Sequence, residues 1–346
     1  MADHLTESAD TVGDPLVSRQ RTGMKTGRSA AIRIRHAGDT YIGVGGVLIV
    51  LGAYLSITED KFLTWANFVN ILDSQSGVLV VAIGLTFVLL VGGIDLSLGG
   101  MIAFCSVLMA ELLKGGLDPW LALTIGVIAG AAIGTLVNGV LIGKVGLSFL
   151  VVTLGTGSVL RSIAQVRTNG QSQSLFSIRL LGKIQAGHIA GVPYLVWFAL
   201  AILGAGILVL RYTGLGRMIY ATGGNREAAR FAGINVTAVS ITVFGIAGLL
   251  AGMAAVMNVA QLRTASPTAA TGIELTAAAA VLLGGTSFMG GRGTLFGTLL
   301  GVLFLGVLQN GITLRGVSSF WQGIVSGVVL VSAVMLDRIR NGRAMP

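Results

Sequence analysis

Long apolar runs, interrupted by charges, glycine pairs and prolines, fill the chain from Tyr41 onward. A helix needs about 20 mostly apolar residues to cross a hydrocarbon layer about 30 Å thick. Runs of this kind predict about ten membrane-spanning helices, near residues 41–57, 72–92, 96–113, 119–143, 146–166, 191–211, 236–259, 273–289, 294–314 and 318–336. We therefore expect an all-α fold in which residues 41–337 form a single polytopic membrane domain.

The charged residues support this membrane arrangement. Only 11% of the 346 residues are charged and 53% are hydrophobic, whereas a soluble domain has about 25% charged residues. The net charge of +9 comes from basic residues clustered just outside the apolar runs, which favours membrane orientation over nucleic-acid binding. This bias predicts that both termini are cytoplasmic, with a disordered basic tail over residues 1–40 and a second tail over 338–346. Met24 opens a basic stretch of its own and is an alternative translation start to Met1.

Many of the predicted spans are rich in glycine and alanine, as in GVIAGAAIGTLVNGVLIG and GTLFGTLLGVLFLG. Small residues three or four positions apart let helix backbones approach closely in lipid, where there is little hydrophobic drive for helices to associate. Tight helix packing is therefore the expected role of most of the 52 glycines.

Signatures of soluble enzymes are absent from the sequence. The stretch GGTSFMGGRGT resembles a phosphate-binding loop, but it lacks the Gly-Lys-Ser/Thr ending and follows an apolar span rather than a strand. No histidine or carboxylate set has metal-ligand spacing, and the single cysteine, Cys105, lies inside an apolar run. We expect no catalytic residue, no metal and no cofactor bound by this chain.

A carboxylate stands in the apolar run LLVGGIDLSLGGM, which predicts a break between two helices. An ionised aspartate at the centre of a membrane helix costs about 2.5 to 3.5 kcal/mol. If Gly92 and Gly93 end one helix, Asp95 can accept backbone N–H groups at the start of the next, with Ser97 assisting. A structural role is favoured over sugar or proton chemistry, although a charge-dependent role stays open.

A second stretch, VLLGGTSFMGGRGT, interrupts an apolar run in a similar way. Its glycine pairs, Gly284 with Gly285 and Gly290 with Gly291, bracket residues that include hydroxyls. Gly-interrupted segments at matching places indicate internal duplication and functional breaks in transporters. We therefore treat both stretches as candidate hinges.

The polar segment 211–236 separates two strongly apolar spans and has room for a short helix. Within GGNREAARFAG, Asn225 is a suitable N-cap and Gly233 a suitable C-terminal stop. Composition alone favours an ordinary connecting loop anchored by positive charge.

Several polar residues lie inside the predicted spans. Each can touch a transported solute or bond a neighbouring helix, and the second role is the commoner one. Three are candidate translocation-path residues: Asn138, Gln309 and Asn310. Arg263 and Glu274 are candidate contacts for an external partner.

The motifs GGIDLSLGG, GGNREAARFAGINV, PTAATGIELTAAAAVLLGGTSFMGGRGTLFGTLLG and NGITLRGVSSFWQ occur in this order between Phe62 and Asp337. Together they resemble the permeases of bacterial monosaccharide ABC importers of the ribose and arabinose type. The resemblance implies a multi-pass inner-membrane subunit that pairs with a second permease, identical or different. It also implies a periplasmic sugar-binding protein and paired ATPase subunits, which bind the ATP and Mg.

In such importers a short cytoplasmic helix of the permease sits in a groove of the ATPase. By position and pattern, the resemblance implies this coupling role for Gly223, Gly224, Asn225, Ala228, Ala229, Gly233 and Ile234. The alternatives are a permease for branched-chain amino acids or another small solute, and a carrier or channel that works without an ATPase. A membrane-embedded enzyme is disfavoured because no catalytic set is present.

Overall fold

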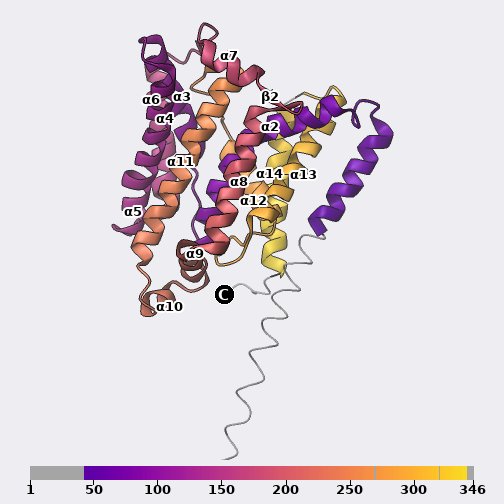
Figure 1. The fold of residues 1–346 in the computed structure, drawn as a ribbon. Coiled ribbons are helices and arrows are strands. Elements are labelled where there is room, and N and C mark those ends of the chain that lie inside the picture. The colour runs from indigo at the N-terminus through magenta and orange to yellow at the C-terminus, as the bar shows by residue number, and fades with distance from the viewer. Residues whose placement is uncertain (1–42, 269, 319, 341–346) are drawn as a thin grey trace, which may run out of the picture. The chain divides into compact units, whose positions relative to one another are not determined.

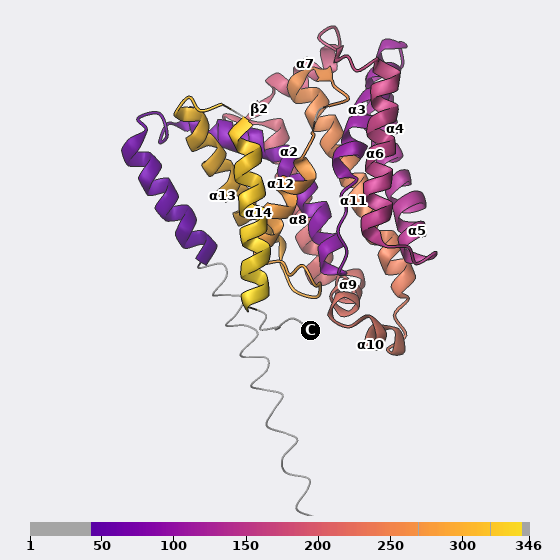
Figure 2. The same cartoon turned by 180° about the vertical axis from the view of Figure 1, so that it is seen from behind.

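The computed structural model describes residues 43–268, 270–318 and 320–340, which are almost wholly helical (Figures 1 and 2). The whole of the expected N-terminal tail, with Met1 and Met24, and residues 341–346 lie outside the described residues. The helices are Gly43–Thr58, α2 (Trp65–Leu90), α3 (Leu98–Lys114), α4 (Pro119–Ala132), the π-helix η1 (Ile133–Gly139), α5 (Val140–Gly143), α6 (Phe149–Thr168), α7 (Arg179–Ala186), α8 (Tyr194–Tyr212), α9 (Gly214–Gly224), α10 (Arg226–Phe231), α11 (Val236–Leu262), α12 (Ile273–Leu283), α13 (Leu295–Leu314) and α14 (Phe320–Arg340).

Four short strands form two antiparallel pairs among the described residues. β1 (Gln173–Ser174) pairs with β4 (Thr264–Ala265), and β2 (His188–Ile189) pairs with β3 (Val192–Pro193). All four lie in connections between helices, on the end of the bundle that also carries α7 (Figure 1). They tie connections together and contribute no layer to the fold.

Each of the ten predicted ranges overlaps a helix, and the all-helical expectation is confirmed. By length and composition, six stretches of the described chain could each cross a membrane, with α4, η1 and α5 counted as one. Two boundaries differ from the prediction. α2 begins at Trp65 rather than near residue 72, because Thr64 caps it and the helix carries polar residues ahead of the apolar run. α12 ends at Leu283 rather than near 289, because Gly285 takes a left-handed backbone with φ of 87°.

α2 and α11 form the centre of the bundle, and long stretches of both are buried. Glycines set the distance between α11 and its neighbour α4. A Cβ atom added to Gly130 would lie 2.5 Å from the carbonyl oxygen of Gly248, so both positions require the absence of a side chain. The expected role of glycine in close helix packing is therefore confirmed at this crossing.

The two ends of the bundle differ in what they carry (Figures 1 and 2). The lower end in Figure 1 holds α9, α10, the end of α2 and the connection between α12 and α13. The first residues of the Gly43–Thr58 helix and the last described residues of α14 also lie toward this end. The upper end holds α7 and both strand pairs.

Candidate functional site

Three chain segments that the sequence singled out separately meet at the lower end of the bundle. They are the end of α2 at Leu90–Gly92, the end of α9 at Gly223–Gly224, and the turn Gly290–Gly291 between α12 and α13. The backbone N–H of Gly291 donates a hydrogen bond of 2.9 Å to the carbonyl oxygen of Leu90. We call this contact the glycine junction.

The glycine junction is a contact of backbone on backbone. A Cβ atom on Gly223 would overlap the carbonyl oxygen of Leu90 and lie 2.6 Å from the nitrogen of Gly291. A Cβ on Gly290 would lie 2.8 Å from the nitrogen of Gly92, and one on Gly291 would lie 2.7 Å from Cα of Gly224. Residues 92, 290 and 291 also have φ of 82°, 86° and 70°, which L side chains rarely adopt. Space therefore requires glycine at position 223, backbone conformation requires it at position 92, and both require it at positions 290 and 291.

The remaining glycines of the two candidate hinges lie beside the junction rather than in it. Gly93 packs against Val88 and Phe244 of the two central helices. Gly284 abuts the backbone of Gly297, so it sets the approach of α12 to α13. The glycine pairs of the two stretches therefore differ in role. Gly92 of the first stretch meets Gly290 of the second across the junction, whereas Gly284 and Gly285 close the end of α12.

Asp95 lies in the non-helical segment between α2 and α3 and has an exposed fraction of 0%. Its Oδ1 accepts hydrogen bonds from the backbone N–H of Ser97 (2.9 Å) and from the Ser97 hydroxyl (2.5 Å). Ser97 is the N-cap of α3, yet its side chain makes no capping bond to that helix. The carboxylate therefore shapes the turn that leads into α3, and among the described residues it forms no ion pair.

The second partner of Asp95 is Asn138, one of the three candidate translocation-path residues. Asn138 donates from Nδ2 to the Ser97 hydroxyl (2.8 Å) and to Oδ2 of Asp95 (3.4 Å). Its own Oδ1 is buried without a hydrogen-bond partner among the described residues. Asn138 lies on η1, a π-helix, and such single-turn distortions are frequent at functional sites. No local residue pattern predicts this distortion.

The other two candidate path residues lie far along the bundle, between α13 and α2. Gln75 donates from Nε2 to Oε1 of Gln309 at 3.2 Å. Asn67 and Asn310 exchange two side-chain hydrogen bonds of 3.0 and 2.8 Å. Gln309 and Asn310 thus hold two helices together, and the structure does not bring them to Asn138.

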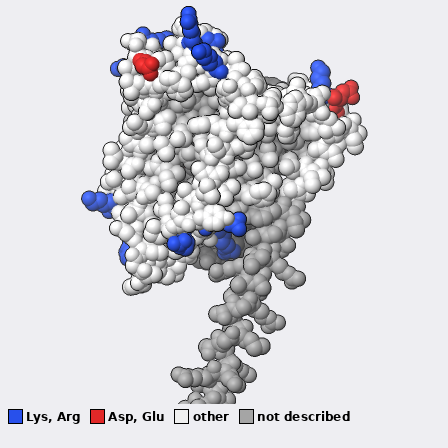
Figure 3. Space-filling view, in the orientation of Figure 1, with Lys and Arg blue, Asp and Glu red and all other residues white. Residues whose placement is uncertain are grey.

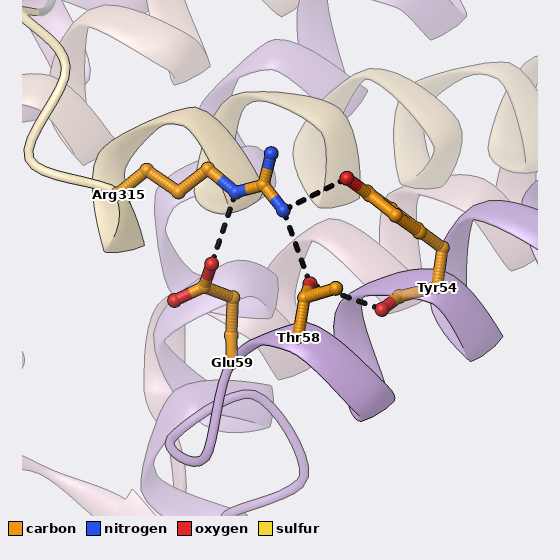
Figure 4. Close-up of polar contacts among 4 residues, drawn as sticks. All are labelled: Tyr54, Thr58, Glu59 and Arg315. Carbon is orange, nitrogen blue, oxygen red and sulfur yellow. Dashed lines mark hydrogen bonds and ion pairs between the residues drawn. The ribbon is translucent and has the colours of Figure 1, made fainter.

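Arg315 makes further polar links at the upper end of the bundle, close to the Asn67–Asn310 pair. Arg315, which follows α13, donates from Nε to Glu59 (2.9 Å) and from Nη2 to Tyr54 and Thr58 (both 3.1 Å), as Figure 4 shows. These bonds fasten the end of the Gly43–Thr58 helix to α13.

Arg263 and Glu274, the candidate contacts for an external partner, have different surroundings. Arg263 donates to the carbonyl oxygen of Phe176, and its guanidinium lies 4.8 Å from the centre of the Phe176 ring. Oε2 of Glu274 is buried and has no hydrogen-bond partner among the described residues. Arg263 therefore has a local structural role in the upper connections.

The short helix expected within residues 211–236 is present as α10. Oδ1 of Asn225 accepts from the backbone N–H of Ala228 at 2.9 Å, and Gly233 ends the helix with φ of 82°. The backbone N–H of Ile234 then returns to the carbonyl oxygen of Ala229 at 3.0 Å. Cap and stop are both confirmed, because this residue pattern satisfies the ends of a helix too short to be stable by itself.

α10 presents one large apolar side chain that the sequence reading missed. Phe231 is 92% exposed, whereas Ala229 on the same short helix is 4% exposed. A lone aromatic residue in an otherwise polar and alanine-rich segment was the only available signal. An exposed aromatic side chain on a surface helix is a typical anchor for a protein partner.

Comparison with known proteins shows the family of the chain. The family described as "Branched-chain amino acid transport system / permease component" matches residues 67–334. The ribose import permease protein of Escherichia coli K12 is 42% identical over 293 residues, which cover 84% of this chain and 91% of that protein. The D-allose transport system permease protein of the same strain is 36% identical, with 84% and 89% covered. The L-arabinose ABC transporter permease protein of Azospirillum brasilense is 36% identical, with 87% and 88% covered.

No solved structure matches the chain. The helical bundle and its candidate membrane spans are those of an integral membrane protein. The chain belongs to the family of ABC-importer permease components that its matched segment and relatives represent. Such subunits form the translocation pathway in the bacterial inner membrane, and a separate subunit hydrolyses ATP.

Proposed function

We propose that this chain carries a monosaccharide, with a pentose as the best candidate, from a periplasmic binding protein into the cytoplasm. The observation that carries the proposal is the 42% identity to a ribose import permease over 84% of the chain. Relatives named for allose and arabinose transport point to the same substrate class. The description of the matched family names branched-chain amino acids, so an amino acid or another small solute is the alternative.

We further propose about ten spans, with both termini and the coupling segment 211–236 on the cytoplasmic side. In Figure 1 the start of the Gly43–Thr58 helix, the end of α14 and α10 lie toward one end of the bundle. Residues 41–337 would then be one permease domain flanked by cytoplasmic tails. The break between α2 and α3 at residues 91–97 would be a helix interruption within the membrane.

In this proposal α10 sits in a groove of an ATPase partner, which binds the ATP and Mg, and Phe231 is its central anchor. The exposure of Phe231 and the capped, defined shape of α10 support this role. Ala228 on the exposed side permits close approach, while buried Ala229 holds α10 against the permease. A second permease copy, identical or different, completes the membrane part.

The glycine junction offers a route from α10 to the membrane helices. Closure of the ATPase would move α9 and α10, and Gly223 would transmit the movement to Gly291 and Leu90 without flexible side chains between them. The end of α2 and the α12–α13 connection would follow. This movement would switch the permease between outward-open and inward-open states.

For the solute path we propose a weak site, since a strong one would hold the sugar in transit. The unpartnered Oδ1 of Asn138 is the acceptor best suited to a sugar hydroxyl among the three candidate path residues. Gln309 and Asn310 would contribute only if their bonds to α2 opened.

Transport by the assembled importer tests the substrate class. The permease, its ATPase and a periplasmic binding protein that stimulates the complex are reconstituted in vesicles and supplied with labelled ribose, arabinose, allose or leucine. We expect ATP-dependent sugar uptake, and calorimetry on the binding protein should rank the same sugars. Leucine as the preferred ligand would select the amino-acid alternative. Uptake by the permease without its ATPase would instead select a carrier or channel.

Phe231→Ala tests coupling separately. We expect the variant to assemble in the membrane and to keep the fold, because the side chain is exposed, yet to lose stimulation of ATP hydrolysis by loaded binding protein. Phe198→Ala, on α8, removes another exposed phenylalanine and is the matched control. Unchanged stimulation in Phe231→Ala would contradict the anchor role.

A further inference from the structure

A polar cleft of about 470 Å³ opens between the α5–α6 connection and α10. Lys144 comes from the end of α5, and Ser148 precedes α6. Arg226 and Arg230 come from α10, and Thr237 comes from the first turn of α11. The cleft therefore lies between the ends of three candidate membrane spans, Pro119–Gly143, α6 and α11, and the short surface helix α10.

The cleft is lined by three cations and by no carboxylate. Among the described residues, neither Lys144 nor Arg230 forms a hydrogen bond or ion pair through its side chain, and Arg226 reaches only the Ser240 hydroxyl, at 3.4 Å. The Ser148 side chain makes no capping bond, so the positive end of α6 faces the same space. An anion with several acceptor oxygens would satisfy these groups together.

The charge distribution around the cleft agrees with this preference. In Figure 3 the visible Asp and Glu side chains lie at the upper end, while the described lower part of this face shows Lys and Arg. The cleft lies at that basic end of the bundle, beside α10. An anion there would meet attraction from its surroundings as well as from the cleft itself.

The chain segment that lines one side of the cleft also carries exposed apolar side chains. Leu147 lines the cleft and is 46% exposed. Val145 and Leu150, which are 58% and 44% exposed, are sequence neighbours of the lining residues, where α5 ends and α6 begins. A free anion would gain nothing from these side chains, whereas the acyl chains of a lipid would cover them.

We propose that this cleft binds the phosphate group of an anionic phospholipid. The phosphate lies between Lys144 and Arg230, and the acyl chains leave along Val145 and Leu150 toward the bilayer. Basic pockets between helices at a membrane surface suit such headgroups, and each nearby cation adds to the attraction. Because the ligand would touch both the α5–α6 connection and α10, it would link the membrane boundary to the coupling segment.

Native mass spectrometry of the full-length permease tests the proposal. Delipidated protein in neutral detergent is titrated with dioleoylphosphatidylglycerol or with dioleoylphosphatidylcholine. We expect preferential binding of the anionic lipid, and about thirtyfold weaker binding in the double variant Lys144→Gln, Arg230→Gln, at about fivefold per cation. The control Arg179→Gln, Lys183→Gln removes the same charge from exposed positions on α7 and should bind like the unmodified protein.

Two further arms control for loss of structure and identify the source of the anion. Lys144→Arg with Arg230→Lys keeps the charge and should keep lipid binding, which guards against a general loss of structure. Excess inorganic phosphate should leave the lipid bound. Complete displacement by phosphate would assign the cleft to a free anion and overturn the proposal.

Two other results would also overturn it. Equal retention of both lipids by the unmodified protein and the glutamine variant would mean that the apolar rim alone binds lipid. Loss of ATPase binding in the glutamine variant, with unchanged phosphatidylglycerol binding, would assign the cations to an acidic surface of the protein partner.

Discussion

The two ends of the bundle are held together by different physical means. At the lower end, the glycine junction joins α2, α9 and the α12–α13 connection through backbone atoms. At the upper end, side chains make the links, as in the Asn67–Asn310 pair and the Arg315 cluster of Figure 4. The strand pair β1–β4 also joins two connections there through backbone hydrogen bonds, but the links of the Gly43–Thr58 helix and α2 to the end of α13 are made by side chains.

This difference bears on how the permease can move. Side-chain hydrogen bonds can break and re-form with water or with a new partner at modest net cost. Close-packed backbone segments have no side-chain bonds between them that can break and re-form, so a displacement of one segment must displace its neighbours. The end that carries α10 is therefore suited to transmit movement, and the opposite end is suited to open and close.

The largest effect is expected at Gly223. In Gly223→Ala the new Cβ would overlap the carbonyl oxygen of Leu90, and overpacking of this kind against backbone costs about 3 kcal/mol or more. We expect a large fall in Tm, measured by intrinsic fluorescence in detergent, together with reduced assembly in the membrane.

Gly224→Ala is the matched control for that prediction. It lies next to Gly223 at the end of α9, but a Cβ there meets no atom within 4 Å. Alanine is favoured over glycine in a helix by about 1 kcal/mol, so this variant should be neutral or slightly stabilised. Equal destabilisation by the two substitutions would show that the close backbone contacts of Gly223 are not what holds the lower end together.

The helices were predictable from the sequence because the membrane fixes the length of an apolar run. The cap at Asn225 and the stop at Gly233 were predictable because both act within a few residues. The early start of α2 was missed because Asn67 and Gln75 look unsuited to a membrane helix until their partners on α13 are known.

The glycine junction itself could not be predicted as a contact. Gly92, Gly223 and Gly291 each carry a local signal for a turn, but no local pattern states that they touch. Their meeting depends on how α2, α9 and α12 pack, which is a property of the whole bundle. The exposure of Phe231 could not be predicted either, because it depends on which side of α10 faces the protein.

The second largest effect is expected at Asp95, near the junction but held by side-chain bonds. Asp95→Leu would leave the Ser97 amide and hydroxyl without their acceptor and would remove the weaker bond of Asn138, at a cost of about 1 to 3 kcal/mol. Asp95→Asn keeps one acceptor oxygen for Ser97, so it should retain most of its Tm and of its sugar uptake. Normal assembly with complete loss of uptake in the asparagine variant would instead show that the charge itself is needed.

A smaller effect is expected at the upper end, where Asn67 and Asn310 pair. A double-mutant cycle with Asn67→Ala and Asn310→Ala should give a coupling energy of about 0.6 kcal/mol, the average for polar pairs between membrane helices. Thermal unfolding of the four proteins measures this coupling. A coupling as large as the loss in Gly223→Ala would show that the upper end is fixed as firmly as the lower one.

The smallest effect is expected for Arg315→Gln. The guanidinium is exposed, and solvent and salt screen its ion pair with Glu59, so the Tm of the whole protein should not change measurably. Its bonds to Tyr54 and Thr58 nevertheless fasten the Gly43–Thr58 helix to α13, so amide hydrogen exchange in that helix should become faster. Lys61→Gln removes a nearby charge whose side chain makes no hydrogen bond or ion pair among the described residues, and should leave exchange unchanged. Faster exchange in both variants would point to lost positive charge rather than to the lost link, and the upper end would then be held by packing alone.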